Sequence, residues 1–348
     1  MTPDTWRRRR VLVTGCTGLL GSWLSSWLIK QKADVVGLVR DSVPRSNFHR
    51  LKLDERITVV HGALEDYGTV ERALNEYEIE VVFHTGAQTL VGIANANPLS
   101  TFSANIQGTW NVLEAARQLS GTRAVIVASS DKAYGAQATL PYTEDAPLIG
   151  RHPYDVSKSC VDLIAQSYWH SYRLPVAVTR CGNFYGGGDL NFNRVVPGTI
   201  RSLLDDQRPL IRSDGTPRRD YVYIEEAVGA YVLLAEHVLD GHGHGECYNF
   251  AAGEPMRVLE MVECISRLMG RSDLEPRILN EATNEIPDQY LDPHKAEVEL
   301  GWKPRYTVEQ GLTQTIGWYE AFFSETTQAM RQPDTTTAVP ASTRRVRT

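Results

Sequence analysis

Features typical of secreted, metal-binding or nucleic-acid-binding proteins are scarce in this sequence. Its 348 residues include five cysteines and no Cys-x-x-Cys pair, so we expect neither a disulfide framework nor a metal site, and we predict a reducing, cytoplasmic compartment. Its 36 basic residues are outnumbered by 42 acidic ones, and the formal net charge of −6 offers no positive field for nucleic acid or an anionic membrane surface. A small molecule is therefore the expected ligand.

Residues 11–29 carry no charge and follow four arginines, which is a pattern that a secretory leader or a membrane helix also shows. Three glycines, Gly15, Gly18 and Gly21, interrupt this stretch, and serine and threonine interrupt it further. We interpret it as a strand, a turn and a helix.

Short β-branched runs alternate with amphipathic stretches of helix length through the first half of the chain. The runs that predict buried parallel strands are residues 11–13, 35–39, 57–60, 81–83, 124–127 and 176–178. The stretches with apolar residues at helical spacing are residues 22–30, 67–77, 105–119 and 154–172. Right-handed crossovers join such units into an α/β fold with a doubly wound parallel sheet of the Rossmann type, whose ligands bind at the carboxyl ends of the strands.

The alternation loosens after Gly182, where glycines and prolines become frequent and the elements shorten. We predict a dinucleotide-binding domain at residues 1–181, with a return to the sheet at about 218–245, and a smaller, mainly substrate-binding lobe at 182–325. Large apolar residues are scarce from 326 to 348, so a disordered tail is expected there.

A glycine-rich turn follows the first predicted strand and opens the first predicted helix. Glycines there allow a sharp turn and a close approach of the backbone to a pyrophosphate, whose charge the helix N-terminus stabilises. We therefore expect a dinucleotide, and the residues that would bind it are Gly15, Thr17, Gly18, Leu19, Leu20 and Gly21.

No acidic residue closes the second predicted strand, where an acid that binds the adenosine ribose is usual. Val39 stands there, and Arg40 and Asp41 follow. Arg40 favours the extra phosphate of NADP, whereas Asp41 would repel it, so both cofactors stay open with NAD preferred. Further candidate cofactor contacts are Leu64, Thr85, Gly86, Ala87, Tyr154 and Lys158.

A candidate catalytic group combines Ser130, at the end of the fifth predicted strand, with Tyr154 and Lys158. The Tyr-x-x-x-Lys spacing places both side chains on one face of a helix. Tyrosine, with an ordinary pKa of about 10, is a poor base at neutral pH, but a neighbouring ammonium and an oxidised nicotinamide favour its phenolate. Tyr154 is thus predicted to take a hydroxyl proton as hydride leaves.

Together these motifs resemble the extended short-chain dehydrogenases/reductases that act on nucleotide sugars, over about residues 10–320. Residues 21–28, 129–134 and 182–189 are most similar to CDP-glucose 4,6-dehydratases, and residues 37–40 also resemble GDP-mannose 4,6-dehydratases, so the nucleobase stays open. The resemblance implies tightly bound NAD(P), a nucleotide-sugar substrate, a role in deoxysugar biosynthesis and a homodimer.

Asp131 and Lys132 separate two candidate reactions. Simple sugar epimerases of this family typically carry small or apolar residues after the serine, whereas a 4,6-dehydratase needs an added base for C5 and an acid for the C6 hydroxyl. The resemblance implies Asp131 as the acid, with Lys132 where most such dehydratases carry glutamate. Because a lysine must lose its proton to act as a base, the two roles could be exchanged. A 4-epimerase that uses only Ser130, Tyr154 and Lys158 is the alternative.

Candidate substrate contacts lie after the later predicted strands. The resemblance places Asn183 at the phosphates of the nucleotide sugar. It also implies that Arg219, in a Gly-x-x-x-Arg-Asp segment, clamps the diphosphate through its forked guanidinium. Arg194 and Arg212 are further candidates for the same charge, and Gln88 is a candidate for the substrate.

Overall fold

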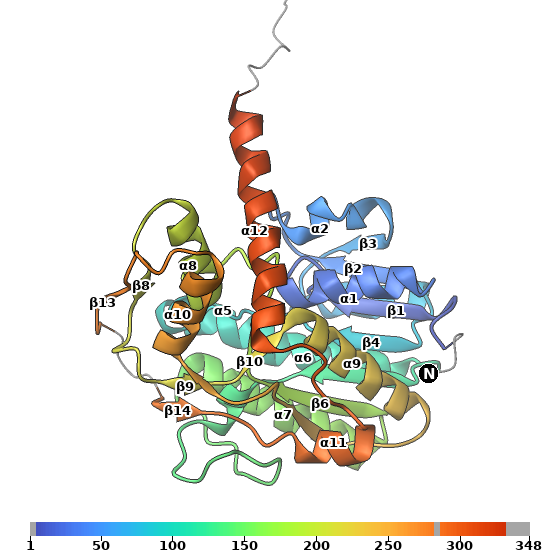
Figure 1. Ribbon diagram of the computed structural model, residues 1–348. Coiled ribbons are helices and arrows are strands. Elements are labelled where there is room, and N and C mark those ends of the chain that lie inside the picture. The colour runs from blue at the N-terminus through green and yellow to red at the C-terminus, as the bar shows by residue number, and fades with distance from the viewer. Residues whose placement is uncertain (1–4, 282–285, 332–348) are drawn as a thin grey trace, which may run out of the picture.

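The computed structural model describes residues 5–281 and 286–331, with side chains up to residue 325. Its centre is a sheet of seven parallel strands in the order β11-β6-β5-β4-β1-β2-β3 (Figure 1). Their bounds are β1 Arg10–Thr14, β2 Asp34–Val39, β3 Thr58–His61, β4 Val81–His84, β5 Ala124–Ala128, β6 Val176–Cys181 and β11 Cys247–Phe250. All six strands predicted from the sequence are present, and the doubly wound parallel sheet is confirmed.

Helices cover both faces of this sheet. One face packs against α1 (Leu19–Lys30) and α9 (Ile224–Leu239), and the other packs against α3 (Tyr67–Glu76), α6 (Gly108–Gln118) and α7 (Pro153–Tyr172). Successive side chains of a strand alternate between the two layers, so Val11 and Val13 of β1 join the first core and Leu12 joins the second. Both faces are buried, which is why the strands are continuous apolar runs in the sequence.

The helices differ from the predicted ranges mainly at their starts. α1 begins at Leu19 rather than at residue 22, because the glycine turn leads directly into its first turn. The helix expected from residue 105 has its α-helical part from Gly108 onward, and a π-helical turn at Ser103–Gln107 precedes it. Short helices that were not predicted are α2 Asn47–Arg50, α4 Val91–Ala96 and α5 Pro98–Phe102, with 3₁₀ turns η1 Leu53–Glu55 and η3 Asp131–Tyr134.

The chain after β6 builds small sheets and helices beside the carboxyl ends of the central strands. β7 (Asn183–Tyr185) pairs in parallel with β10 (Tyr221–Tyr223), and β9 (Arg218–Arg219) lies between β12 (Met256–Arg257) and β14 (Asp288–Gln289). The remaining elements are β8 Leu210–Ile211, β13 Arg277–Ile278, α8 Val195–Leu204, α10 Val258–Leu268 and α11 His294–Leu300. The return expected at about 218–245 supplies α9, and the strand that rejoins the sheet, β11, follows two residues beyond that range.

The last helix, α12 (Val308–Arg331), projects beyond the body of the molecule in Figure 1. Residues 326–331 are helical, whereas a tail was expected from 326; the rest of that expected tail, 332–348, lies outside the described residues. Near the body, the Arg50 guanidinium of α2 lies over the Trp318 ring, 5.1 Å from its centroid, and joins this helix to the segment after β2. Within the described residues, no helix is both long and apolar enough to cross a membrane.

Candidate active site

The short helix η3 places Ser130, Asp131 and Lys132 directly after strand β5. Ser130 begins this turn: its Oγ accepts from the backbone N–H of Lys132 at 3.2 Å and donates to Oδ1 of Asp131 at 2.8 Å. Asp131 is only 3% exposed, and its second oxygen, Oδ2, has no hydrogen-bond partner within the described chain. A buried carboxylate oxygen without a partner is costly, so the site holds an acceptor ready for a ligand.

The first turns of α7 bring Tyr154 and Lys158 to the same place. Pro153 opens the helix, and both side chains are buried. The Nζ atom of Lys158 donates to the Ala128 carbonyl at the end of β5 at 2.7 Å and lies 6.0 Å from the centroid of the Tyr154 ring. The Ser130 hydroxyl lies close enough to Tyr154 to lower the pKa of its phenol. The structure therefore gathers the serine, tyrosine and lysine predicted as a catalytic group.

Burial and two opposite charges control the proton of Tyr154. Burial raises the pKa of its phenol to about 12, and the Asp131 carboxylate adds to this rise, whereas the Arg194 guanidinium lowers the pKa. Burial lowers the pKa of the Lys158 amine to about 8, while the Asp162 carboxylate acts in the opposite direction. The phenol is thus protonated at neutral pH in the absence of ligands, and a positive charge beside it would favour the phenolate.

A cavity of about 150 Å³ lies at the carboxyl ends of β1, β2 and β4. Six of the residues predicted to bind the cofactor line it: Gly15, Thr17, Arg40, Leu64, Gly86 and Ala87. Six lining residues were not predicted as contacts: Leu38, Asp41, Val43, Gly62, Glu65 and Ala104. Most of these follow β2 and β3, where the sequence offers no phosphate-binding motif, so only their position after a strand could have indicated them.

Seven other residues predicted to bind the cofactor do not line this cavity: Gly18, Leu19, Leu20, Gly21, Thr85, Tyr154 and Lys158. The glycines shape the turn: Gly15 has φ +69°, and a Cβ on Gly21 would lie 2.2 Å from the Gly15 carbonyl oxygen. Thr85 donates to the Thr14 carbonyl at 2.6 Å and joins the ends of β4 and β1. The N-cap of α1 is Gly18, which has no side chain to cap the first turn, so this turn and the uncapped helix N-terminus fit the pyrophosphate of a dinucleotide.

Arg40 and Asp41 were expected to have opposite effects on a 2′-phosphate. They form an ion pair in which Nε of Arg40 lies 2.6 Å from Oδ2 of Asp41. Both side chains are more than half exposed and line the cofactor cavity. The carboxylate thus lies against the only group at this strand end that was expected to attract a 2′-phosphate.

Three of the predicted substrate residues, Arg194, Asn183 and Arg212, form side-chain contacts with other parts of the protein. Arg194 pairs with Asp189 at 3.0 Å, and its charge is close enough to lower the pKa of Tyr154, so it lies near the reacting groups. The Asn183 amide donates to the Asp220 carbonyl at 3.3 Å. Arg212 is exposed and donates to Asn193 at 2.6 Å.

The side chains of Gln88 and Arg219 form hydrogen bonds with backbone groups. The Gln88 side chain accepts from the Leu90 N–H at 2.7 Å. Arg219 is buried, and its guanidinium donates to the carbonyls of Arg218, Pro287 and Ile286 at 2.6–2.8 Å. This fork supports the backbone of the lobe, and the diphosphate clamp inferred for Arg219 stays a prediction.

Gln289 and Asp220 border the site and were not predicted. Gln289, on β14, is fully buried and contacts both Asp131 and Lys132. The pKa of Asp220 is raised to about 7 by burial and, to a smaller extent, by the Asp131 carboxylate, against the hydrogen bond from the Leu291 N–H, which lowers it. Asp220 could have been found because it follows Arg219 in a recognised segment; nothing in the local sequence indicates Gln289.

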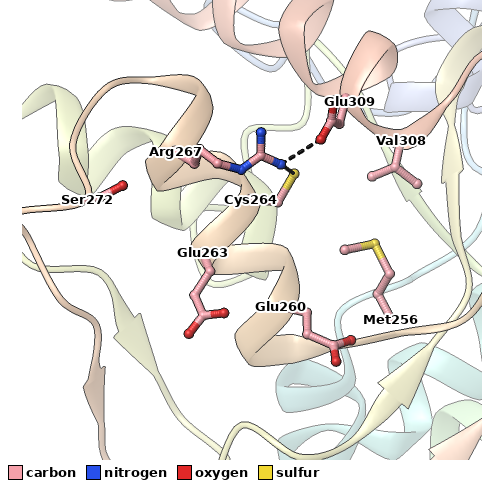
Figure 2. Close-up of a pocket in the computed structure, with 8 residues that line it drawn as sticks. All are labelled: Met256, Glu260, Glu263, Cys264, Arg267, Ser272, Val308 and Glu309. Atoms are coloured by element: carbon pink, nitrogen blue, oxygen red, sulfur yellow. Dashed lines mark hydrogen bonds and ion pairs between the residues drawn. The ribbon is translucent and has the colours of Figure 1, made fainter.

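A second, larger cavity of about 530 Å³ lies away from these residues, between α10 and the start of α12 (Figure 2). An ion pair between Arg267 and Glu309 joins the two helices at 2.6 Å, and the Cys264 thiol accepts from the same guanidinium at 3.5 Å. None of the residues predicted to be functional lines this cavity.

Comparison with known proteins identifies the family of this chain. Residues 12–315 match the model of the GDP-mannose 4,6 dehydratase family. The chain is also 32% identical over 334 residues to the CDP-glucose 4,6-dehydratase of Salmonella typhimurium, an alignment that covers 91% of this chain and 92% of the relative. This chain belongs to the GDP-mannose 4,6 dehydratase family. The resemblance stated from the sequence motifs is confirmed.

Solved structures related to this family member include both dehydratases and epimerases. The dTDP-glucose 4,6-dehydratase of Streptomyces venezuelae with NAD and TYD bound is similar with a TM-score of 0.81 and 28% identity, and the match covers 90% of this chain and 97% of that one. The UDP-glucose 4-epimerase of Thermotoga maritima with UDP-glucose has a TM-score of 0.83 and 26% identity, with coverage of 90% and 99%. The backbone alone therefore does not separate the two reactions.

Proposed function

We propose that this chain is a nucleotide-sugar 4,6-dehydratase that converts a nucleoside-diphosphate hexose, with CDP-glucose favoured, into the 4-keto-6-deoxy sugar. The observation that carries the proposal is the pair Asp131 and Lys132, which follows Ser130 in the same turn and lies close enough for Asp131 to affect Tyr154. An epimerase needs only the serine, tyrosine and lysine. The unpartnered Oδ2 of Asp131 supplies the additional group that water loss requires.

The turn at Gly15, the free N-terminus of α1 and the cavity beside them support a dinucleotide cofactor. When bound, NAD supplies a hydride acceptor for C4 and later a hydride donor for C6. NAD is favoured over NADP because Asp41 would repel a 2′-phosphate and already pairs with Arg40. Removing Asp41 would free this arginine for such a phosphate.

In the proposed reaction, Ser130 and Tyr154 hold the C4 oxygen, and Tyr154 takes its proton. The 4-keto group acidifies the C5 hydrogen, which Lys132 removes as a proton. Asp131 gives a proton to the C6 hydroxyl, so water leaves and a C5–C6 double bond remains. Hydride return to C6 and return of the proton from Lys132 to C5 complete the product. Transfer of the proton that Tyr154 gained to Asp131, which lost one, restores both side chains for the next turnover. The Arg194 charge lowers the pKa of Tyr154 and so favours the phenolate, which is the form that can take the C4 hydroxyl proton.

Two further properties belong to this proposal. A homodimer is proposed because α6 and α7 expose large apolar side chains at Trp110, Leu163 and Tyr172, and two such helices can pair across a two-fold axis. A cytoplasmic location is proposed because all five cysteines are free, four of them buried as thiols.

The proposal is tested by giving the purified protein CDP-glucose, GDP-mannose, UDP-glucose and dTDP-glucose separately and measuring product masses. We expect one substrate to lose a single water, because Asp131 and Lys132 supply the acid and the base of the proposed elimination. Tyr154→Phe, which keeps the ring and removes the proton acceptor, should retain bound cofactor and lose turnover. A product of unchanged mass with inverted C4 would establish the epimerase instead, and no conversion of any substrate would contradict both reactions.

A further inference from the structure

Gln289 reaches from the C-terminal lobe to the catalytic turn. It lies on β14, where it pairs in parallel with Arg219 of β9, and it is fully buried. Its side chain leaves this small sheet and contacts η3: Nε2 donates to the Asp131 carbonyl at 2.9 Å, and Oε1 accepts from Nζ of Lys132. One amide thus touches both residues that distinguish a dehydratase from an epimerase.

The two ends of this amide cannot be exchanged. The Asp131 carbonyl oxygen can only accept, so the amide nitrogen must face it and the amide oxygen must face Lys132. An amide oxygen accepts a hydrogen bond from either an ammonium or a neutral amine. The contact therefore persists when Lys132 loses or gains a proton, which suits a group that transfers protons.

The segment that carries Gln289 is anchored on both sides. Before it, the Arg219 guanidinium binds the carbonyls of Ile286 and Pro287. After it, the Asp220 carboxylate accepts from the Leu291 N–H at 2.7 Å, and the Tyr142 N–H donates to the Tyr290 carbonyl at 3.0 Å. Because these anchors come from the lobe and from the loop after η3, the amide is held at a fixed distance from the catalytic turn.

Carboxylates also lie near Lys132. Asp131 precedes it on the same turn, and the positive charge of Lys132 acts on Asp155 of α7, whose pKa it lowers against the effect of burial. A lysine paired closely with a carboxylate keeps its proton and is a poor base. The amide contact directs Nζ toward β14.

We propose that Gln289 is a positioning residue that holds Nζ of Lys132 for proton transfer at C5, so that the lobe completes the dehydration site. This inference rests on the proposed function. It assigns to β14 a part in one chemical step, the removal of the C5 proton, and none in the oxidation at C4.

The test compares Gln289→Leu, which removes both hydrogen bonds with little change in volume, with the wild type and with Gln207→Leu on the exposed loop after α8. Formation of reduced nicotinamide reports C4 oxidation, and deuterium uptake from solvent at C5 reports proton transfer. We expect Gln289→Leu to slow deuterium uptake roughly 10- to 100-fold and to change C4 oxidation less than about 2-fold, so that reduced nicotinamide accumulates.

Gln289→Glu supplies the second readout, because it keeps an acceptor for Lys132 and adds a negative charge. It should restore part of the deuterium uptake but move its rise to higher pH than in the wild type, because the new carboxylate joins Asp131 and Asp155 in holding the lysine proton. If Gln289→Leu does not fold, as judged by circular dichroism, this pH shift alone decides the inference.

Two results would overturn the inference while leaving the proposed function intact: equal slowing of both steps in Gln289→Leu, or unchanged deuterium uptake. An unshifted pH profile in Gln289→Glu would overturn it as well. Absence of water loss in the wild type would instead overturn the proposed function, and the inference with it.

Discussion

The proton of Tyr154 depends on a residue assigned to a different step. The Asp131 carboxylate raises the pKa of the phenol, and the Arg194 guanidinium lowers it. If Asp131 is the acid for the C6 hydroxyl, it must carry a proton when water leaves, and in that protonated form it no longer opposes the phenolate. The charge of one side chain therefore couples C4 oxidation to elimination.

Asp131→Asn tests this coupling. The amide cannot give up a proton as a carboxylic acid does, so we expect water loss to slow at least about 10-fold. Because the change also removes a negative charge that raises the pKa of Tyr154, the phenolate should form at lower pH. The rise of C4 oxidation with pH, measured by reduced nicotinamide in single turnovers, should move to lower pH.

Asp145→Asn, on an exposed part of the loop after η3, is the matched control. In this variant C4 oxidation should rise at the same pH as in the wild type. A rise at unchanged or higher pH in Asp131→Asn would show that the two groups are not coupled. Equal slowing of oxidation and water loss would make Asp131 a structural residue.

At the scale of elements, one buried arginine connects the two pieces of structure that carry the catalytic group. Arg180 of β6 forms a bidentate pair with Asp162 of α7 at 2.8 and 2.9 Å, and both side chains are almost fully buried. Its third contact, at 2.7 Å, is the hydroxyl of Tyr134 on η3. The helix that positions Tyr154 and the turn that positions Ser130 are thus held to the same strand.

Arg180→Met should destabilise the protein by about 3–5 kcal/mol, because it leaves the Asp162 carboxylate buried without its cation. The free energy of unfolding, measured by urea denaturation, gives this loss directly. The double variant Arg180→Met/Asp162→Leu should recover much of it, since the uncompensated charge is then gone. The partly exposed pair of Arg117 and Glu114 on α6 offers a control, and Arg117→Ala should cost at most about 1 kcal/mol. A loss in Arg180→Met no larger than in this control would contradict the expectation.

Considered over the complete protein, the features that the sequence predicted are those that short sequence segments encode by themselves. The central strands are buried on both faces and are therefore apolar runs in the sequence, and the glycine turn and the Tyr-x-x-x-Lys pair each lie within one short segment. Gln289 could not be found in this way, because a contact across 157 residues brings it to Lys132 from a strand of two residues. Arg219 has the side chain expected of an anion clamp, yet its guanidinium donates to the carbonyls of Ile286 and Pro287, just before β14. Local sequence thus predicted the sheet and its turns, and packing between lobe and sheet decided the rest.

That packing should give the stability of the molecule a dependence on pH through Asp220, which lies where the lobe meets the sheet. Its carboxylate accepts from the Leu291 N–H, and burial raises its pKa to about 7, against about 4 in an unfolded chain. Between these values the folded protein holds a proton that the unfolded chain has lost, so this residue's contribution to stability falls as pH rises from about 4 to 7 and does not change further above pH 7.

Asp220→Asn keeps an acceptor for Leu291 and does not titrate. The unfolding free energy of the variant, measured in urea, should therefore increase relative to that of the wild type by up to roughly 1.4 kcal/mol per pH unit as the pH rises across this window. Asp145→Asn controls for the loss of one negative charge, and parallel pH profiles for Asp220→Asn and the wild type would show that Asp220 is already ionised in the fold.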